Sequence, residues 1–299
     1  MTNEPLDSEF EPWVAIQRNP TSGSGRGNRL IIDLIAELRR LNIRPRLFSN
    51  RERMQRWLAA EHGRQPPLCL VAAGGDGTVC DLVNRYPLMP IAILPLGTEN
   101  LLARYLGIGR SGRDVARMIA ENRQRQFDTG LANGKRFLIM ASLGFDADVI
   151  HRMQAYRRGH ITRWSYVRLI WDAIRAFRHP EMSIYVDGSP TPLTGRLAVI
   201  TNVPMYALQL PIARSAIGDD GLLDLHLFRE GSLFQLVRYL YHIVRGSHER
   251  LPDVIHVTGR EFRIECEELL PIQIDGDAAG TTPVTIAVEP QSCVLLTPP

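Results

Sequence analysis

A glycine-rich break between two apolar segments constrains the fold of this chain more than any other feature. The stretch LCLVAAGGDGTVCDLVNRY (68–86) runs from an apolar segment through GGDGT (74–78) into an alternation of polar and apolar residues. This order predicts a strand, a tight turn and a helix, an arrangement whose backbone N–H groups bind phosphate. The usual phosphate loop carries a lysine after its last glycine, but the only lysine of this chain is Lys135. A phosphate site here would have to use other groups.

The residues around this break alternate between short apolar runs and helical patterns. The runs that predict strands are WVAIQ (13–17), RPRLFS (44–49), LCLVAA (68–73) and IAILPLG (91–97). Helical patterns occur at 29–42, 51–63, from 79 onward, at 99–107 and at 111–122. Alternation at this spacing indicates parallel β–α units with helices on both faces of a sheet. We therefore predict an α/β domain over residues 12–130.

The second half of the chain has a different pattern. After about Phe127, short β-rich segments such as RFLIMASLGF, GLLDLHLFRE and PVTIAVEP are bounded by Gly, Pro, Asn or Asp. They predict a β-sandwich domain over residues 131–299, with a return of the last residues to the first domain left open. Two helical stretches interrupt it, at about 150–178 and 231–246. Two domains also suit a chain of 299 residues, because one hydrophobic core rarely organises that length.

Composition excludes several classes of protein. The hydrophobic content of 44% is ordinary for a globular soluble protein, and the net charge of +3 is too small to indicate a nucleic-acid-binding protein. The four cysteines have no metal-ligand spacing, so buried reduced thiols are expected. The N-terminus is acidic rather than signal-like, and no apolar run reaches the roughly 20 residues of a membrane-spanning helix. We expect a cytoplasmic protein, with peripheral contact at the inner membrane surface left open.

Three glycine-containing turns follow predicted strands of the first domain. They are NPTSGSG (19–25), GGDGT (74–78) and PLGTEN (95–100). In a parallel sheet such turns share the carboxyl edge, where ligands bind. Their backbone N–H groups, together with serine and threonine hydroxyl groups, could hold a polyphosphate without lysine. The alternative for each turn is that glycine only permits a tight bend.

Asp76 adds an expectation of its own to GGDGT. Its carboxylate would repel phosphate unless a divalent cation lay between them. Magnesium prefers oxygen ligands and keeps several waters, so one carboxylate with phosphate oxygens suffices to hold it. A Mg²⁺ ion near Asp76 is therefore expected.

Five motifs together resemble those of a known family. They are NPTSG, GGDGT, PLGTEN, DDGLLD (219–224) and QIDGD (273–277). Their order and spacing are similar to those of the diacylglycerol kinase catalytic family, which includes soluble bacterial lipid kinases and the sphingosine and ceramide kinases. The similarity runs from about Trp13 to the C-terminus. It implies that ATP and Mg²⁺ bind in an active-site cleft between a Rossmann-like or phosphofructokinase-like α/β domain and a β-sandwich domain.

The resemblance assigns roles residue by residue. The positions implied to contact the nucleotide are Asn19, Pro20, Thr21, Ser22, Gly23, Ser49, Gly74, Gly75, Asp76, Gly77, Thr78, Val79, Thr98 and Asn100. Asp76 is implied to be catalytic as well, through the metal. Asp275 matches the aspartate assigned as general base, which would accept the proton of a lipid hydroxyl as its oxygen attacks the γ-phosphate. Asp277 matches a glutamate of the usual DGE triplet and would orient the site or help to hold metal. Without the other motifs, DGD would be an ordinary hairpin turn.

A second metal site is implied by DDGLLD. In soluble bacterial members this loop holds a structural Mg²⁺, and the matching ligands are Asp220 and the main-chain oxygens of Ile217 and Leu222. The alternative is an acidic hairpin turn without a metal.

Several positions depart from the family pattern. Asp81 replaces the glutamate of GGDGTxxE, and Leu101 replaces the aspartate of GTxND, which leaves the metal geometry open. Sphingosine-type members also lack that aspartate. MYALQLPI (205–212) replaces a glycine cluster and Arg214 replaces a proline. Both lie near where an acceptor lipid would bind, so the identity of the lipid is the least determined feature.

One segment of the second half suits a lipid interface. RRGHITRWSYVRLIWDAIRAFRH (157–179) has helical spacing that gathers aromatic and aliphatic residues on one arc, with arginine beside them. Tryptophan with a basic rim is typical of a helix at a membrane surface. A helix packed on the sandwich with extended arginine side chains is the favoured alternative.

The leading prediction is an ATP-dependent lipid kinase, most simply one that converts diacylglycerol to phosphatidate. A sphingoid or other lipid alcohol is the nearest alternative acceptor. Two other interpretations are an NAD kinase, which shares GGDGT but fits PLGTEN and DGD less well, and a regulator that binds nucleotide or lipid without catalysis. The expected partner is a membrane lipid, nucleic acid is not expected, and a homodimer is left open.

Overall fold

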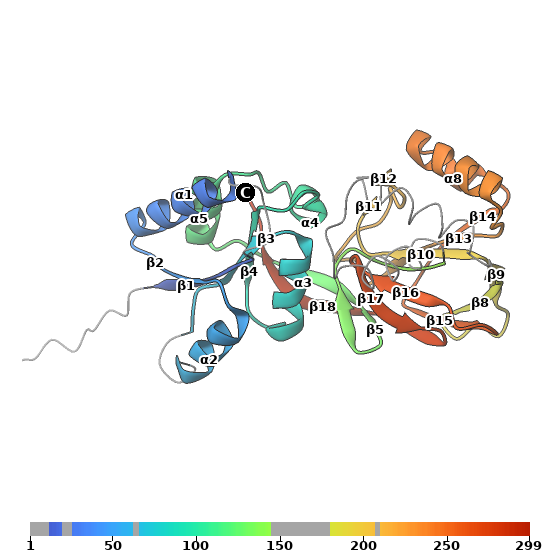
Figure 1. Cartoon of the computed structure of the whole chain (residues 1–299), viewed down its shortest axis with the longest axis horizontal. Coiled ribbons are helices and arrows are strands. Elements are labelled where there is room, and N and C mark those ends of the chain that lie inside the picture. Colours follow the sequence, from blue (N-terminus) through green and yellow to red (C-terminus); the bar gives the residue numbers. More distant parts are fainter. Residues whose placement is uncertain (1–11, 20–25, 62–65, 145–179, 207–209) are drawn as a thin grey trace, which may run out of the picture. The chain divides into compact units, whose positions relative to one another are not determined.

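The chain folds into two compact units (Figure 1). The computed structural model describes residues 12–19, 26–61, 66–144, 180–206 and 210–299. The first unit runs to Arg125 and also takes in Val294–Pro299, and the second unit is Gln126–Cys293. The first has a parallel sheet flanked by helices and the second has antiparallel sheets. The predicted fold class is confirmed, and a cleft between the two units stays a prediction.

A parallel sheet forms the centre of the first unit. Its strands are β1 (Trp13–Arg18), β2 (Arg44–Phe48), β3 (Leu70–Gly74) and β4 (Ile91–Pro95), in the order β2–β1–β3–β4. The end of β18 (Val284–Leu296) adds to it, with Leu295 parallel to Ile91. Every residue of β3 and β4 is buried, as expected for strands covered on both faces.

Helices cover the two faces of this sheet. They are α1 (Arg26–Arg40), α2 (Arg51–Glu61), α3 (Asp76–Arg85), α4 (Leu101–Tyr105) and α5 (Gly112–Glu121). In Figure 1, α1 and α5 lie on one side of the strands and α2 and α3 on the other. The start of α5 packs directly on the backbone of α1, because a side chain at Gly112 would lie 2.2 Å from the carbonyl oxygen of Leu30.

Two antiparallel sheets form the second unit. One has the order β14–β13–β10–β7–β16–β17: β14 (Val254–Gly259), β13 (Leu223–Phe228), β10 (Leu197–Thr201), β7 (Met140–Leu143), β16 (Pro271–Ile274) and β17 (Asp277–Thr281). The other has the order β18–β15–β8–β9, in which β18 is followed by β15 (Glu261–Cys266), β8 (Met182–Val186) and β9 (Leu193–Gly195). Beside this order, β5 (Gln124–Ala132) pairs with β18 and with β6 (Lys135–Phe137).

Alternate residues of these strands form one hydrophobic core. Leu225 and Ile272 come from one sheet, and Ile184, Phe262 and Ile286 come from the other, and all are fully buried. This period of two is the sandwich pattern that the sequence predicts.

Shorter elements complete the second unit. β11 (Met205–Tyr206) pairs with β12 (Leu210–Pro211), α8 (Leu233–Arg245) follows β13, and a 3₁₀ turn spans His248–Arg250. The helix expected at 231–246 is thus confirmed. The helix expected at about 150–178, including the segment 157–179, lies outside the described residues.

Candidate functional site

The turns after the parallel strands begin level with one another. In the register of the sheet, Gly74 pairs with Pro95 and Ala73 pairs with Arg18. Gln17 in turn pairs with Phe48. The segments that follow β1, β2, β3 and β4 therefore leave the sheet side by side at its carboxyl edge, where ligands bind in open α/β sheets.

The GGDGT and PLGTEN turns pack backbone against backbone. A side chain at Gly97 would lie 2.6 Å from the Cα atom of Gly75, which is closer than real Cβ atoms come. The carbonyl oxygen of Gly74 accepts hydrogen bonds from the backbone N–H groups of Leu96 (2.8 Å) and Gly97 (3.3 Å). Glycine at 75 and 97 thus allows two loops from neighbouring strands to form one rigid surface.

Asn100 fixes the shape of the second turn. It is buried and adopts a left-handed conformation with φ of 50°. Its side chain accepts a hydrogen bond from the Gly97 N–H (2.9 Å) and donates one to the Gly97 carbonyl oxygen (2.8 Å). Arg110 also donates to that oxygen. Asn100 is therefore a framework residue of the loop.

Asp76 connects the two turns. Its Oδ2 and Oδ1 accept hydrogen bonds from the backbone N–H groups of Leu101 (3.0 Å) and Leu102 (3.1 Å), at the start of α4. Burial raises the pKa of Asp76 above its ordinary value, and these hydrogen bonds partly offset the rise. Each carboxylate oxygen retains a further lone-pair direction, so this capping leaves Asp76 able to bind a cation. The side chain of Leu101, which replaces the aspartate of GTxND, takes no part in this contact.

The start of α3 faces open space. Gly75 is the N-cap residue, Gly77 is exposed, and a side chain at Gly77 would meet no atom within 4 Å. The positive end of a helix with open space beside its first turn suits an anion such as phosphate.

Thr78, which the resemblance implies to contact the nucleotide, has a buried side chain. Its hydroxyl oxygen is buried, has no hydrogen-bond partner among the described residues, and lies 2.1 Å from where a Gly74 side chain would begin. Val79 is buried as well. The backbone N–H groups of Thr78 and Val79 donate to the carbonyl oxygen of Gly75 (2.9 and 3.4 Å), so they close the first turn of α3. The contact with the Thr78 side chain explains why glycine is needed at 74.

Other implied nucleotide contacts lie at the same edge. Asn19 follows β1 and its N–H donates to the carbonyl oxygen of Ala73 (3.1 Å). Ser49 and Thr98 are exposed, so their hydroxyl groups are accessible. Pro20, Thr21, Ser22 and Gly23 lie outside the described residues.

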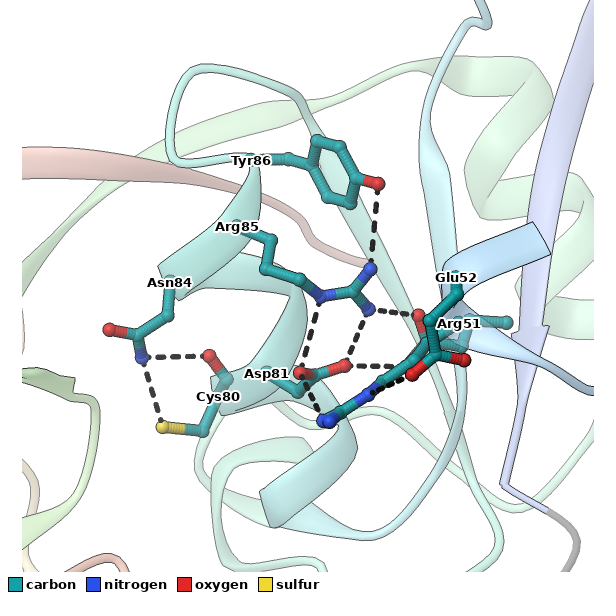
Figure 2. Close-up of polar contacts among 8 residues, drawn as sticks. Arg51, Glu52, Cys80, Asp81, Asn84, Arg85 and Tyr86 are labelled. Carbon is teal, nitrogen blue, oxygen red and sulfur yellow. Dashed lines mark hydrogen bonds and ion pairs between the residues drawn. The ribbon is translucent and has the colours of Figure 1, made fainter. Parts of the chain in front are cut away.

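Asp81, the replacement for the family glutamate, belongs to a polar cluster beside this edge (Figure 2). Its carboxylate accepts hydrogen bonds from Gln17 Nε2 (2.8 Å) and from the Arg85 guanidinium (2.5 and 3.2 Å), and Arg51 lies 3.8 Å away. Arg85 also donates to the side-chain oxygen of Gln17. The cluster joins β1, α2 and α3, so Asp81 connects the strand before NPTSGSG to the helix that begins in GGDGT.

In the second unit, Asp275 and Gly276 form the two-residue turn between β16 and β17. Both have positive φ, 46° and 86°, which is the hairpin geometry that an Asp-Gly pair favours. The Asp275 carboxylate accepts hydrogen bonds from the backbone N–H groups of three successive residues: Leu138 (2.8 Å), Ile139 (3.0 Å) and Met140 (3.0 Å). These bonds tie the hairpin to the start of β7.

Asp277 is differently placed from Asp275. It is the first residue of β17, it pairs with Ile274, and it is exposed. The two carboxylates of DGD thus separate into one that is held by the backbone of its own unit and one that faces outward.

The DDGLLD loop carries the implied second metal site. Oδ1 of Asp220 accepts a hydrogen bond from the backbone N–H of Leu222 (3.0 Å). Burial raises the pKa of Asp220, and the negative charges of Asp224 and Asp128 add to the rise. One carboxylate in negative surroundings, with main-chain oxygens of Ile217 and Leu222 in the same loop, is a donor set that fits Mg²⁺.

Asp128, in β5, contacts this loop and is a residue that the sequence does not reveal. It is fully buried, and its carboxylate accepts hydrogen bonds from Gly221 N–H (2.7 Å) and Gln291 N–H (2.6 Å). Its own N–H donates to the carbonyl oxygen of Gly218 (2.8 Å). The only sequence signal was a lone acidic residue in a β-rich run.

Among the described residues, no helix is both long enough and apolar enough to cross a bilayer. The four cysteines are free, and Cys69 and Cys293 are buried as expected.

Two family models match the chain. The model described as the diacylglycerol kinase catalytic domain matches residues 14–132, and the model described as the YegS C-terminal NAD kinase beta sandwich-like domain matches residues 139–297. Their boundary falls near the division between the two units, and the second match alone spans more than half of the chain.

Individual proteins show the same similarity at low identity. A protein named diacylglycerol kinase in Staphylococcus carnosus (strain TM300) is 23% identical over 288 residues, which cover 94% of this chain and 93% of that protein. An uncharacterised protein from Synechocystis is 26% identical over 241 residues, 77% of this chain and 54% of that protein, so this chain spans about half its length. A crystal structure from Bacillus anthracis strain Sterne, described as a candidate diacylglycerol kinase, has a TM-score of 0.73 at 21% identity and covers 98% of this chain and 99% of that chain. That likeness supports the fold alone.

Proposed function

We propose that this chain, which belongs to the diacylglycerol kinase family, is an ATP-dependent lipid kinase that phosphorylates the hydroxyl group of a membrane lipid. The observation that carries the proposal is the interlocked pair of GGDGT and PLGTEN turns beside the open start of α3. A rigid surface of backbone N–H groups at a helix start can bind phosphate without a lysine side chain. This is how the chain would dispense with the residue that its phosphate loop lacks.

Phosphoryl transfer depends on alignment and charge neutralisation more than on covalent chemistry. The loops of the first unit would hold the β- and γ-phosphates, and Asp76 would hold Mg²⁺, which neutralises phosphate charge when bound. The acceptor oxygen would form its bond to the γ-phosphorus as the bond to the bridging oxygen breaks and ADP leaves. The proton of the acceptor hydroxyl would pass to a carboxylate of the second unit.

The geometry favours Asp277 over Asp275 as that carboxylate. Three N–H donors already occupy the Asp275 oxygens, so they stabilise its negative charge and hold it against its own unit. Asp277 is exposed, two residues further along. We therefore revise the assignment made from the resemblance: Asp275 positions the turn, and Asp277 accepts the proton.

Diacylglycerol is the acceptor that the family suggests, with phosphatidate as the product. Sphingoid bases and other lipid alcohols are the alternatives, because the altered segment around Arg214 lies where an acceptor would bind by analogy with the family. The proposal includes a site of action at the inner face of the membrane, reached from the cytoplasm.

The test is a transfer assay with the purified full chain. The protein is incubated with labelled ATP, Mg²⁺ and separate acceptors: diacylglycerol, sphingosine, ceramide and NAD. Label on a lipid supports the proposal and identifies the acceptor class. Label on NAD would replace it with an NAD kinase. ATP binding without transfer to any acceptor would favour a non-catalytic regulator.

The variant D277N tests the assigned base in this assay, and E267Q is its matched control. D277N should lose transfer by about 100-fold or more, the usual contribution of a general base. Glu267→Gln removes an exposed negative charge elsewhere in the second unit and should keep full activity. Equal losses in the two variants would show a general charge effect instead of a base.

A further inference from the structure

Helix α8 presents an unusually apolar face to solvent. The exposed fractions are 76% for Phe234, 60% for Val237, 55% for Tyr241 and 61% for Val244. These four residues follow the spacing i, i+3, i+7, i+10 and so form one stripe along the helix. Leu240, 50% exposed, lies beside them. Isolated exposed apolar residues are common, but a continuous stripe marks a surface of interaction.

The opposite face of α8 is firmly anchored, so the stripe is held outward. Tyr239 is buried, its hydroxyl donates to Asp253 Oδ2 (2.7 Å), and its ring lies 4.8 Å from that of Phe228. Arg238 bonds to the same Asp253 oxygen (2.8 Å). Both ends of the helix are capped, by the Ser232 hydroxyl accepting from Gln235 N–H and by Gly246 with φ of 63°.

Exposed arginines gather at the C-terminal end of the stripe. α8 contains no acidic residue, and Arg245 near its end is exposed. The guanidinium of exposed Arg214 lies over the C-terminal end, where it fills the space that a side chain at Gly246 would need. Exposed Arg250 follows in the next turn. The nearest acidic residue after the helix, Glu249, bonds to His226 (3.0 Å).

We propose that this stripe of Phe234, Val237, Tyr241 and Val244, together with Leu240 beside it, docks the protein on the surface of an anionic lipid bilayer. Apolar and aromatic side chains would enter the headgroup boundary, and Arg214, Arg245 and Arg250 would contact anionic headgroups. The proposal deepens the proposed lipid kinase activity, because an enzyme whose acceptor lies in a bilayer must reach it there.

A second copy of the chain is a poorer occupant. A helix of 13 residues is about 20 Å long and offers a strip of roughly 200 Å², whereas a stable dimer buries about 800 Å² on each partner. The like charges of the arginines would also repel between copies. A negatively charged bilayer meets both the apolar and the basic parts of the surface.

The test measures binding to vesicles that contain no acceptor lipid and no ATP, so it is independent of catalysis. The full chain is sedimented with vesicles of phosphatidylcholine alone and of phosphatidylcholine mixed with phosphatidylglycerol. We expect binding to the mixed vesicles, and a loss of roughly ten-fold or more in V237E and in F234E. Arg245→Ala should weaken binding to the mixed vesicles only.

Ile32→Glu is the matched control. Ile32 is an apolar residue of α1 that is 65% exposed, so this variant makes the same chemical change on a helix of the other unit. It should bind as the unsubstituted chain does. Thermal unfolding of each variant checks that the fold is kept.

Several results would overturn the docking proposal. One is that the α8 variants bind vesicles as well as the unsubstituted chain does. Another is that I32E loses as much vesicle binding as the α8 variants. A third is that sedimentation velocity without lipid shows a dimer that the α8 substitutions abolish. Phosphorylation of a short-chain, monomeric diacylglycerol with no vesicle binding would leave the kinase proposal standing and remove this one. Vesicle binding without phosphorylation of any lipid would leave the docking proposal standing and remove the kinase proposal.

Discussion

Gly97 lies so close to Gly75 that position 97 has no room for a side chain: a Cβ atom on Gly97 would be 2.6 Å from the Cα of Gly75. We predict that Gly97→Ala destabilises the first unit by about 1–3 kcal/mol, the usual cost of overpacking, and weakens nucleotide binding. Chemical denaturation and nucleotide titration measure the two effects. Gly109→Ala is the control, because no atom lies within 4 Å of its Cβ position. If G97A keeps the stability and nucleotide binding of the unsubstituted chain, the close packing of the two loops does not support either property.

Asp76→Ala should have two effects at once. The backbone N–H groups of Leu101 and Leu102 lose their acceptor, so we expect a loss of about 1–2 kcal/mol in the free energy of unfolding. Metal-dependent nucleotide binding and activity should be lost together. Calorimetric titration of nucleotide with and without Mg²⁺ separates the metal effect from the capping effect. If the variant keeps both metal-dependent nucleotide binding and activity, Asp76 does not hold the metal.

Asp275→Asn and Asp277→Asn should behave differently. In D275N the amide replaces an oxygen that accepts from backbone N–H groups, so we expect a loss of about 1–3 kcal/mol in stability, and activity that falls with it. In D277N the residue is exposed, so stability should change by less than about 0.5 kcal/mol while transfer is lost. Unfolding curves and turnover rates measured on both variants decide the matter. A stable, inactive D275N with an active D277N would return the base to Asp275.

The stability of the second unit should fall in mild acid because of His226. Burial lowers the pKa of this histidine to about 4, against an ordinary value of 6.5. The unfolded chain then binds a proton at a higher pH than the folded chain does. The stabilisation is therefore complete above about pH 6.5 and is lost between pH 6.5 and pH 4, by on the order of 2–3 kcal/mol. Burial lowers the pKa of His248 as well, which acts in the same direction.

His256 acts in the opposite sense. Its hydrogen bond to Asp224 raises its pKa, so its contribution is present in acid and is lost as the pH rises through the raised value. Denaturant unfolding between pH 4 and 8 tests the balance. His226→Gln can still donate to Glu249 and cannot titrate, so its acid loss should be much smaller than that of the unsubstituted chain. If the free energy of unfolding falls equally steeply with decreasing pH in H226Q and in the unsubstituted chain, His226 is not the source of the acid loss.

Local patterns were enough to predict the first unit. The strand, turn and helix of GGDGT follow from neighbouring residues, and the carboxyl-edge position of Gly74 and Pro95 follows from the parallel order. The hairpin turn of DGD also follows from neighbouring residues. What local patterns could not give is the set of partners that turn a motif into a site.

Those partners come from far along the chain. Asp275 is held by N–H groups 135 to 137 residues before it, and Asp81 is bonded to Gln17, 64 residues away. A backbone N–H group does not depend on residue type, so no sequence pattern shows which N–H groups will donate to a given carboxylate. The burial of the Thr78 hydroxyl depends on contact with Gly74 in the folded loop, whereas spacing alone placed it among the phosphate ligands. For α8 the sequence predicts a helix, but which face stays uncovered depends on Asp253 and Phe228 fixing its rotation.

The pairing of Leu295 with Ile91 has a consequence for synthesis. A ribosome makes β4 some 200 residues before it makes the strand that lies next to it. During that interval the edge of β4 stays open to pairing with other chains, which is a common origin of aggregation. Proteolytic removal of the last few residues would recreate the same exposed edge in the mature molecule, even though the loops proposed to bind nucleotide would be untouched.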